Sequence, residues 1–102
     1  MAVLRTLLGE SLRTIRLRQH RTLREVSAGA RVSLGYLSEV ERGVKEASSE
    51  CLAAICSALG VPLSWVLHMV SLEVSREEGA ATVAPLTTVD SAVRLPDVVV
   101  AA

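Results

Sequence analysis

The stretch VSLGYLSEVERG, residues 32–43, decides the fold and organises the rest of the chain. Ser33 is a suitable N-cap for a helix, and Leu37 and Val40 then form one buried stripe along it. Gly43 follows at the place where a helix end favours a residue with positive φ. These features predict a short helix that is held from one side and exposes the other.

The outer face of this predicted helix is small, polar or aromatic, which suits insertion into a groove of DNA. Glu39 can accept a hydrogen bond from a cytosine amino group, and Leu34 can meet a thymine methyl group. For Tyr36, packing on the sugar-phosphate backbone without reading a base is the alternative role. The predicted base-reading residues are Ser33, Leu34, Gly35, Tyr36, Ser38 and Glu39.

A second short helix is predicted just before this one. Thr22 and Glu25 are three residues apart and form a capping box that starts a helix over residues 22–28. Residues 29–32 are then a short connection. A helix, a turn of about four residues and a second helix form the helix-turn-helix signature.

Further helices are predicted on both sides of this motif. Apolar residues spaced by three and four predict helices over residues 4–19 and from Ser48 or Ser49 to Gly60. A fifth helix starts near Pro62, and its apolar arc is too wide for a lone surface helix. It is therefore either central to the bundle or the contact surface of a homodimer. The predicted dimer residues are Leu63, Trp65, Val66, Leu67, Met69 and Val70.

The composition agrees with a helical domain. Half of the 102 residues are apolar, yet only Trp65 and Tyr36 are aromatic, so the core must use Leu, Val, Ile and Ala in an all-α bundle. The net charge is zero, but residues 1–50 carry nine Lys or Arg against six Asp or Glu, a balance of +3. Residues 51–102 carry two against five, a balance of −3. The basic first half favours a polyanionic partner, although only weakly.

Several other classes of protein are not indicated by the sequence. No apolar run suits a signal peptide or the roughly 20 residues of a membrane span, which predicts a cytoplasmic protein. Cys51 and Cys56 fall on different sides of a helix, so we expect no disulfide between them. The sequence has no CxxC motif and no second cysteine pair, and His20 and His68 are far from both cysteines, so no metal is expected. No cofactor is expected either. A Ser/His/Asp set, a phosphate loop and a converging carboxylate pair are all missing, so no enzyme is predicted.

The character of the sequence changes near Ser75. Residues 1–74 are predicted to form the DNA-binding domain with its fifth helix, and residues 75–102 a flexible apolar tail. Its ending, Ala101-Ala102, is similar to the small apolar endings recognised by Clp-type unfoldases, and we interpret it as a degradation signal. A strand docked on the dimer and an ending that arose by neutral drift are the alternative interpretations.

Residues 7–67 resemble the XRE or lambda-repressor-type helix-turn-helix family. The run from Tyr36 to Gly43 and the sequence Leu59-Gly60-Val61 stand in that family's order and spacing. The resemblance implies a five-helix lambda-repressor-like bundle that binds double-stranded DNA. It also implies a structural ion pair between Arg16, which lies beside the apolar stripe of the first helix, and Glu41.

Residues 21–63 resemble a narrower group, the actinobacterial regulators of Clp protease genes. This resemblance implies a dimeric activator of Clp protease and chaperone genes, with RNA polymerase and Clp protease as further partners. Some domains of the same fold are antitoxins or adaptors, so a protein-binding module is the alternative. An adaptor would show no duplex binding, whereas a DNA reader would lose affinity steeply with salt.

Phosphate contacts are expected from helix N-termini and nearby cations. The candidates are Thr22, Arg31, Arg42, Lys45 and Ser48. The chain departs from the family pattern at Leu23, often a glutamine, at Arg31, usually the turn glycine, and at Ala47, usually a proline. A left-handed Arg31 would cost about 1 kcal/mol relative to glycine. We expect Glu39 and Tyr36 to govern sequence choice, and Lys45 and Arg31 to govern overall affinity.

Overall fold

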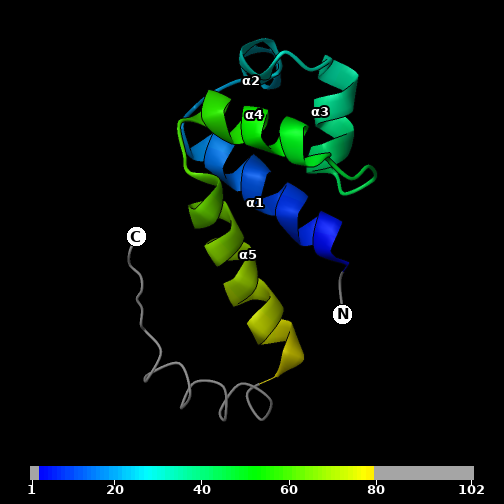
Figure 1. The fold of residues 1–102 in the computed structure, drawn as a ribbon, viewed down its shortest axis with the longest axis vertical. Coiled ribbons are helices and arrows are strands. Elements are labelled where there is room, and N and C mark those ends of the chain that lie inside the picture. Colours follow the sequence, from blue (N-terminus) through cyan, green and yellow to red (C-terminus); the bar gives the residue numbers. More distant parts are fainter. Residues whose placement is uncertain (1–2, 80–102) are drawn as a thin grey trace.

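The computed structural model describes residues 3–79, which form five α-helices (Figure 1). They are α1 Leu4–Arg18, α2 Leu23–Ala30, α3 Leu34–Glu41, α4 Ser49–Leu59 and α5 Leu63–Glu78. Along the longest axis, α2 and α3 lie at one end, α5 extends toward the other, and α1 and α4 lie between them. The all-α prediction is confirmed for this part of the chain, while the Ala101-Ala102 ending lies outside the described residues.

The core is built from aliphatic side chains of all five helices. Each fully buried Leu, Ile or Val contributes about 1.5–3 kcal/mol relative to exposure. Cys56 is one of the core residues, and burial raises the pKa of its thiol. The most deeply buried side chains are Leu12, Leu37, Ile55, Val26, Val66 and Cys56. The helices therefore share one core, which holds α3 from behind.

The three helices α2, α3 and α4 begin at the side-chain caps that the sequence indicates. The hydroxyl groups of Thr22, Ser33 and Ser48 each accept a hydrogen bond from the backbone N–H three residues later, at 3.0, 3.0 and 3.1 Å. Glu25 completes the capping box by accepting from Thr22 N at 2.8 Å. Each such cap stabilises its helix by about 1 kcal/mol.

The helix α2 ends two residues later than predicted, at Ala30. Gly29 does not break the helix, because its missing side chain serves packing: a Cβ there would lie 3.2 Å from Cβ of Ala58 in α4. Arg31 follows in the left-handed conformation with φ of 60°, as expected for the residue that replaces the turn glycine. The turn to α3 is therefore tighter than the sequence suggests.

The end of α3 rests directly on α1. A Cβ on Gly9 would lie 2.3 Å from the carbonyl oxygen of Val40 and 2.7 Å from that of Glu41, so only glycine permits this approach. In the same region, Arg5 Nε donates to the carbonyl oxygen of Gly43 at 3.0 Å. These contacts fix the position of α3 relative to the rest of the bundle.

The segment that follows α1 holds the end of α4. Gln19 Nε2 donates to the carbonyl oxygen of Leu59 at 2.8 Å, and Arg21 donates to that of Ala58. The last carbonyl groups of a helix lack partners within the helix, so these side chains satisfy them. Arg21, one of the basic residues among residues 1–50, therefore has a structural role.

The helix α5 differs from its prediction at both ends. Pro62 precedes the helix as its N-cap instead of occupying the first turn, and the helix continues to Glu78. Residues 75–78, which the sequence assigned to the tail, are therefore helical. The helix continues because neither glycine nor proline occurs between Leu63 and Gly79. Arg76 also forms an ion pair with Glu73, at 3.2 Å, within the last turns.

Neither a spanning helix nor a metal-binding cluster is found among residues 3–79. No single helix there has both the length and the apolar content to cross a membrane. Taken together, α4 and α5 would meet those criteria, but the pair is bent by 103° at the break between them. No three His, Cys, Asp or Glu side chains in the same range are placed to hold a metal ion.

Candidate nucleic-acid interface

The helix α3 presents an open outer face, which we call the reading face and define as Ser33, Leu34, Gly35, Ser38 and Glu39. The first three are exposed and the last two are half-buried. A Cβ on Gly35 would meet nothing within 4 Å, so a partner can approach the helix backbone closely. An α-helix with its side chains is about 10–12 Å across, which matches the width of the major groove, about 12 Å.

A glycine cap closes the end of α3 and positions the loop that follows. Gly43 has φ of 76°, its N–H donates to Val40 O at 3.1 Å, and Val44 N donates to Glu39 O at 2.9 Å. This is the Schellman arrangement of a helix end. Lys45 N also donates to Glu39 O, at 3.3 Å. The cap thus turns the chain so that Lys45 lies alongside Glu39.

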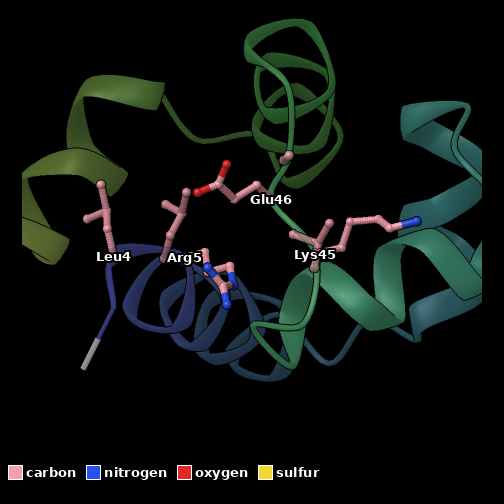
Figure 2. Close-up of a pocket in the computed structure, with 7 residues that line it drawn as sticks. Leu4, Arg5, Lys45 and Glu46 are labelled. Carbon is pink, nitrogen blue, oxygen red and sulfur yellow. The ribbon is translucent and has the colours of Figure 1, made fainter.

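Lys45 lies against both residues that were expected to select sequence. Its Nζ is 3.6 Å from Glu39 Oε1 and 6.0 Å from the centroid of the Tyr36 ring. Figure 2 shows a hollow between the start of α1 and the loop after α3, and the side chain of Lys45 extends away from Leu4 and Glu46 there. The structure therefore brings together residues to which the sequence assigned separate roles.

Tyr36 lies at the edge of the reading face and is partly buried against the core. Burial raises the pKa of Tyr36, and a hydrogen bond with the side chain of Cys51 raises it further. The ring thus links α3 to the first turn of α4. This position fits the alternative of packing on the sugar-phosphate backbone, and base reading by Tyr36 stays a prediction.

The N-termini of α2 and α4 flank opposite edges of α3. Ser38 and Arg42 line a hollow of about 450 Å³ together with Leu23, the first residue of α2, and Arg13 of α1. Tyr36 faces α4 and is about 200° around the helix from Ser38. Helix N-termini carry unpaired N–H groups and a partial positive charge. Both edges of the reading face therefore offer groups that suit phosphates.

The five residues predicted to contact phosphates are all exposed, but they differ in their existing contacts. The hydroxyl groups of Thr22 and Ser48 already cap α2 and α4. Arg42 Nε makes a long contact of 3.4 Å with the carbonyl oxygen of Ser38. The Arg31 side chain makes no hydrogen bond or ion pair within residues 3–79. Of these five residues, Lys45 is the one that forms an ion pair with an acidic side chain, that of Glu39.

Behind the reading face, Arg16 and Glu41 form a bidentate ion pair, as the resemblance implies. Arg16 Nε lies 2.8 Å from Glu41 Oε2, and Nη2 lies 3.0 Å from Oε1. A third donor, Nη1, reaches Arg21 O at 3.0 Å. The hydrogen bond with Glu41 raises the pKa of Arg16 despite burial, so the guanidinium stays charged. This pair clamps α3 onto α1.

Arg13 lies one turn before Arg16, in the hollow beside α3, and it was not among the residues predicted to contact DNA. The sequence could have indicated this position, because Arg13 is three residues before Arg16 and residues three apart share one face of a helix. Arg13 is exposed, so it can reach a ligand in the hollow. It extends the set of cations along the edge of α3 that faces α2.

The helix α5 offers a separate apolar surface, although not the one predicted. Val66 and Val70 pack inside the protomer core, so they cannot face a second copy. Trp65, Leu67 and Leu72 are 45%, 49% and 51% exposed. The remaining two predicted dimer residues, both half-buried against the core, are Leu63 and Met69. Leu72 was not among the predicted dimer residues, because the predicted apolar arc ended at Val70.

Comparison with known proteins agrees with this geometry. The family model for helix-turn-helix domains (HTH_3) matches residues 12–66. The transcriptional regulator ClgR of Mycobacterium tuberculosis (strain ATCC 25618 / H37Rv) is 56% identical over 84 residues, which are 82% of this chain and 75% of that protein.

Solved structures show the same fold. The clp gene regulator ClgR from C. glutamicum is 48% identical, with a TM-score of 0.68 over 72% of this chain and 95% of that chain. The restriction-modification controller protein C.AhdI from Aeromonas hydrophila is 19% identical, with a TM-score of 0.59 over 61% of this chain and 94% of that chain, and it shares the fold alone.

The family match spans both helices of the motif, the turn between them and the core that supports them. The two ClgR relatives indicate the class of protein within this family. Both are named as regulators, and about half of their aligned residues are identical to those of this chain. The chain therefore belongs to the XRE-type helix-turn-helix family and, within it, to the ClgR transcriptional regulators, which makes it a DNA-binding regulator of transcription.

Proposed function

We propose that this regulator binds specific sites in double-stranded DNA with α3 in the major groove and activates Clp protease and chaperone genes. The observation that carries the proposal is the reading face itself: an exposed, capped helix with an open Gly35, set between two helix N-termini. Phosphate groups on each side of the groove would meet those N-termini. The gene class is supported by the relative that is named a clp gene regulator.

We further propose that two copies associate through α5. Trp65 and Leu72 are seven residues apart, which places them on the same side of the helix, and both are about half exposed. Tryptophan is among the residues that dominate interface energies. Recognition helices in such a dimer should sit about 34 Å apart, one turn of DNA.

Light scattering on Leu72→Glu tests this dimer. The variant should be monomeric at high micromolar concentration. Ser71→Glu adds the same charge next to Leu72 in sequence but on another side of the helix, and it should stay dimeric. A wild-type protein that is monomeric both free and on DNA would contradict the proposal.

Footprinting on genomic fragments tests the DNA site directly. The wild type should protect promoters of Clp protease genes, and its affinity should fall steeply with salt. Gly35→Glu should abolish protection without lowering the melting temperature, because a side chain there meets only open space. Ala53→Glu on the exposed side of α4 is the matched control and should bind normally. A protein-binding adaptor would protect no duplex at all.

Transcription with purified RNA polymerase tests the direction of regulation. An activator should raise the transcript level from a protected promoter, and Gly35→Glu should not. A lower transcript level would overturn the activator role and leave the DNA-binding role intact.

A further inference from the structure

Glu39 and Lys45 form an ion pair on the outer side of α3. Their side chains are 40% and 54% exposed, and their charged atoms are 3.6 Å apart. The other carboxylate on α3, Glu41, is turned inward and held by Arg16. Glu39 is therefore the carboxylate that α3 would carry into a DNA groove.

A carboxylate in this position faces an electrostatic problem. Duplex DNA carries one negative charge for about every 1.7 Å of its axis, so it repels an acid that enters the groove. A cytosine amino group can offset the repulsion by donating a hydrogen bond to the acid. Where the base edge that Glu39 meets presents acceptors, as those of guanine and thymine do, no such bond forms, and a cation beside Glu39 must reduce the cost.

The position of Lys45 beside Glu39 is set by the backbone. The glycine cap holds the N–H of Lys45 at 3.3 Å from the carbonyl oxygen of Glu39, and the Tyr36 ring lies 6.0 Å from its ammonium. Arg42, one turn from Glu39, directs Nε to the carbonyl oxygen of Ser38 instead. Lys45 is thus the cation that the fold places at this carboxylate.

We propose that Lys45 is the counterion of Glu39 during DNA recognition, and so is a specificity-determining residue and not only a phosphate contact. The inference rests on the proposed function. Lys45 lowers the penalty of Glu39 on sites that present an acceptor to it, so removing the lysine charge weakens all binding but weakens those sites most. Loss of the lysine charge therefore sharpens the sequence preference at the position that Glu39 reads.

A double-mutant cycle on operator affinity tests the proposal. Lys45→Met removes the charge and keeps the aliphatic stem beside Tyr36, and Glu39→Gln removes the carboxylate. Lys45→Met should weaken binding by about tenfold in the wild type but only about threefold in the Glu39→Gln background, since an exposed pair couples modestly. Melting temperatures of all four proteins check that each variant folds.

The matched control is Arg31→Gln, which removes an exposed cation that makes no ion pair within residues 3–79. Its loss of affinity should be the same in both backgrounds. In a selection from random DNA, Lys45→Met should sharpen the preference at the base pair whose preference Glu39→Gln relaxes.

Equal losses for Lys45→Met in both backgrounds, with every site weakened alike, would overturn the inference and reduce Lys45 to a phosphate contact. A wild type that binds no duplex would instead overturn the proposed function, and this inference with it. The two failures are therefore distinguishable from the wild-type titration alone.

Discussion

The ion pair between Arg16 and Glu41 gives a quantitative prediction about stability. The two side chains are 11% and 6% exposed and share two hydrogen bonds. Arg16→Ala leaves the carboxylate of Glu41 buried without its cation, which should cost about 3–5 kcal/mol. Glu41→Ala leaves the guanidinium with Arg21 O as its remaining acceptor and should cost about 3 kcal/mol.

The double variant should cost much less than the sum of the two. Neither charge is then left behind, and the remaining loss is that of packing around two shortened side chains, about 3–4 kcal/mol. The coupling free energy should therefore be about 3 kcal/mol, at the upper end of values for contacting residues. In a domain of this size each kcal/mol lowers the melting temperature by about 4–8 °C.

Urea unfolding followed by far-ultraviolet circular dichroism measures the cycle. The pair of Arg76 and Glu73 on α5 is the control, because its charged atoms are 3.2 Å apart but the side chains are 77% and 46% exposed. That exposed cycle should give a coupling of about 0.5 kcal/mol or less. Additive losses at Arg16 and Glu41, or equal couplings in the two cycles, would refute the reasoning.

Three further substitutions test the glycine and turn positions. Gly9→Ala should destabilise the fold by at least about 2 kcal/mol in the same urea assay, because its Cβ would lie 2.3 Å from the backbone oxygen of Val40. Gly35→Ala should instead stabilise α3 by about 0.5–1 kcal/mol, since the position is open, and an unfolded or destabilised variant would contradict this. Arg31→Gly should raise stability by up to about 1 kcal/mol, because φ there is 60°. The same Arg31→Gly variant should lower the slope of log affinity against log salt by about 0.9, and an unchanged slope would remove Arg31 from the phosphate contacts.

The features that could be predicted from the sequence are local. The caps at Thr22, Ser33 and Ser48 and the positive φ of Gly43 depend on residues within a few positions of each other, so the sequence alone identifies them. The motif's helices and their order follow from these caps. The ion pair behind α3 needed the family resemblance, because its two residues are 25 positions apart.

The features that were missed depend on how the helices pack. Gly9 resembles an ordinary small residue within a helix until the backbone of α3 is placed against it. Val66 and Val70 could not be separated from the exposed Trp65, because the apolar pattern of α5 does not state which stripe faces the bundle. The contact of Lys45 with the reading face likewise needs the three-dimensional path of the loop.

The fold holds α3 by its ends and its inner side, and this separates recognition from stability for part of the reading face. Leu34, Gly35 and Ser38 are not part of the ion pair that clamps α3 onto α1, so we expect substitutions there to alter the preferred site at little cost in stability. Glu39 and Tyr36 differ, because Glu39 is paired with Lys45 and the Tyr36 ring is partly buried against the core. A substitution of Glu39 or Tyr36 that changes the preferred DNA site therefore requires a second substitution nearby. Lys45, which contacts both residues, is the position where we expect it first.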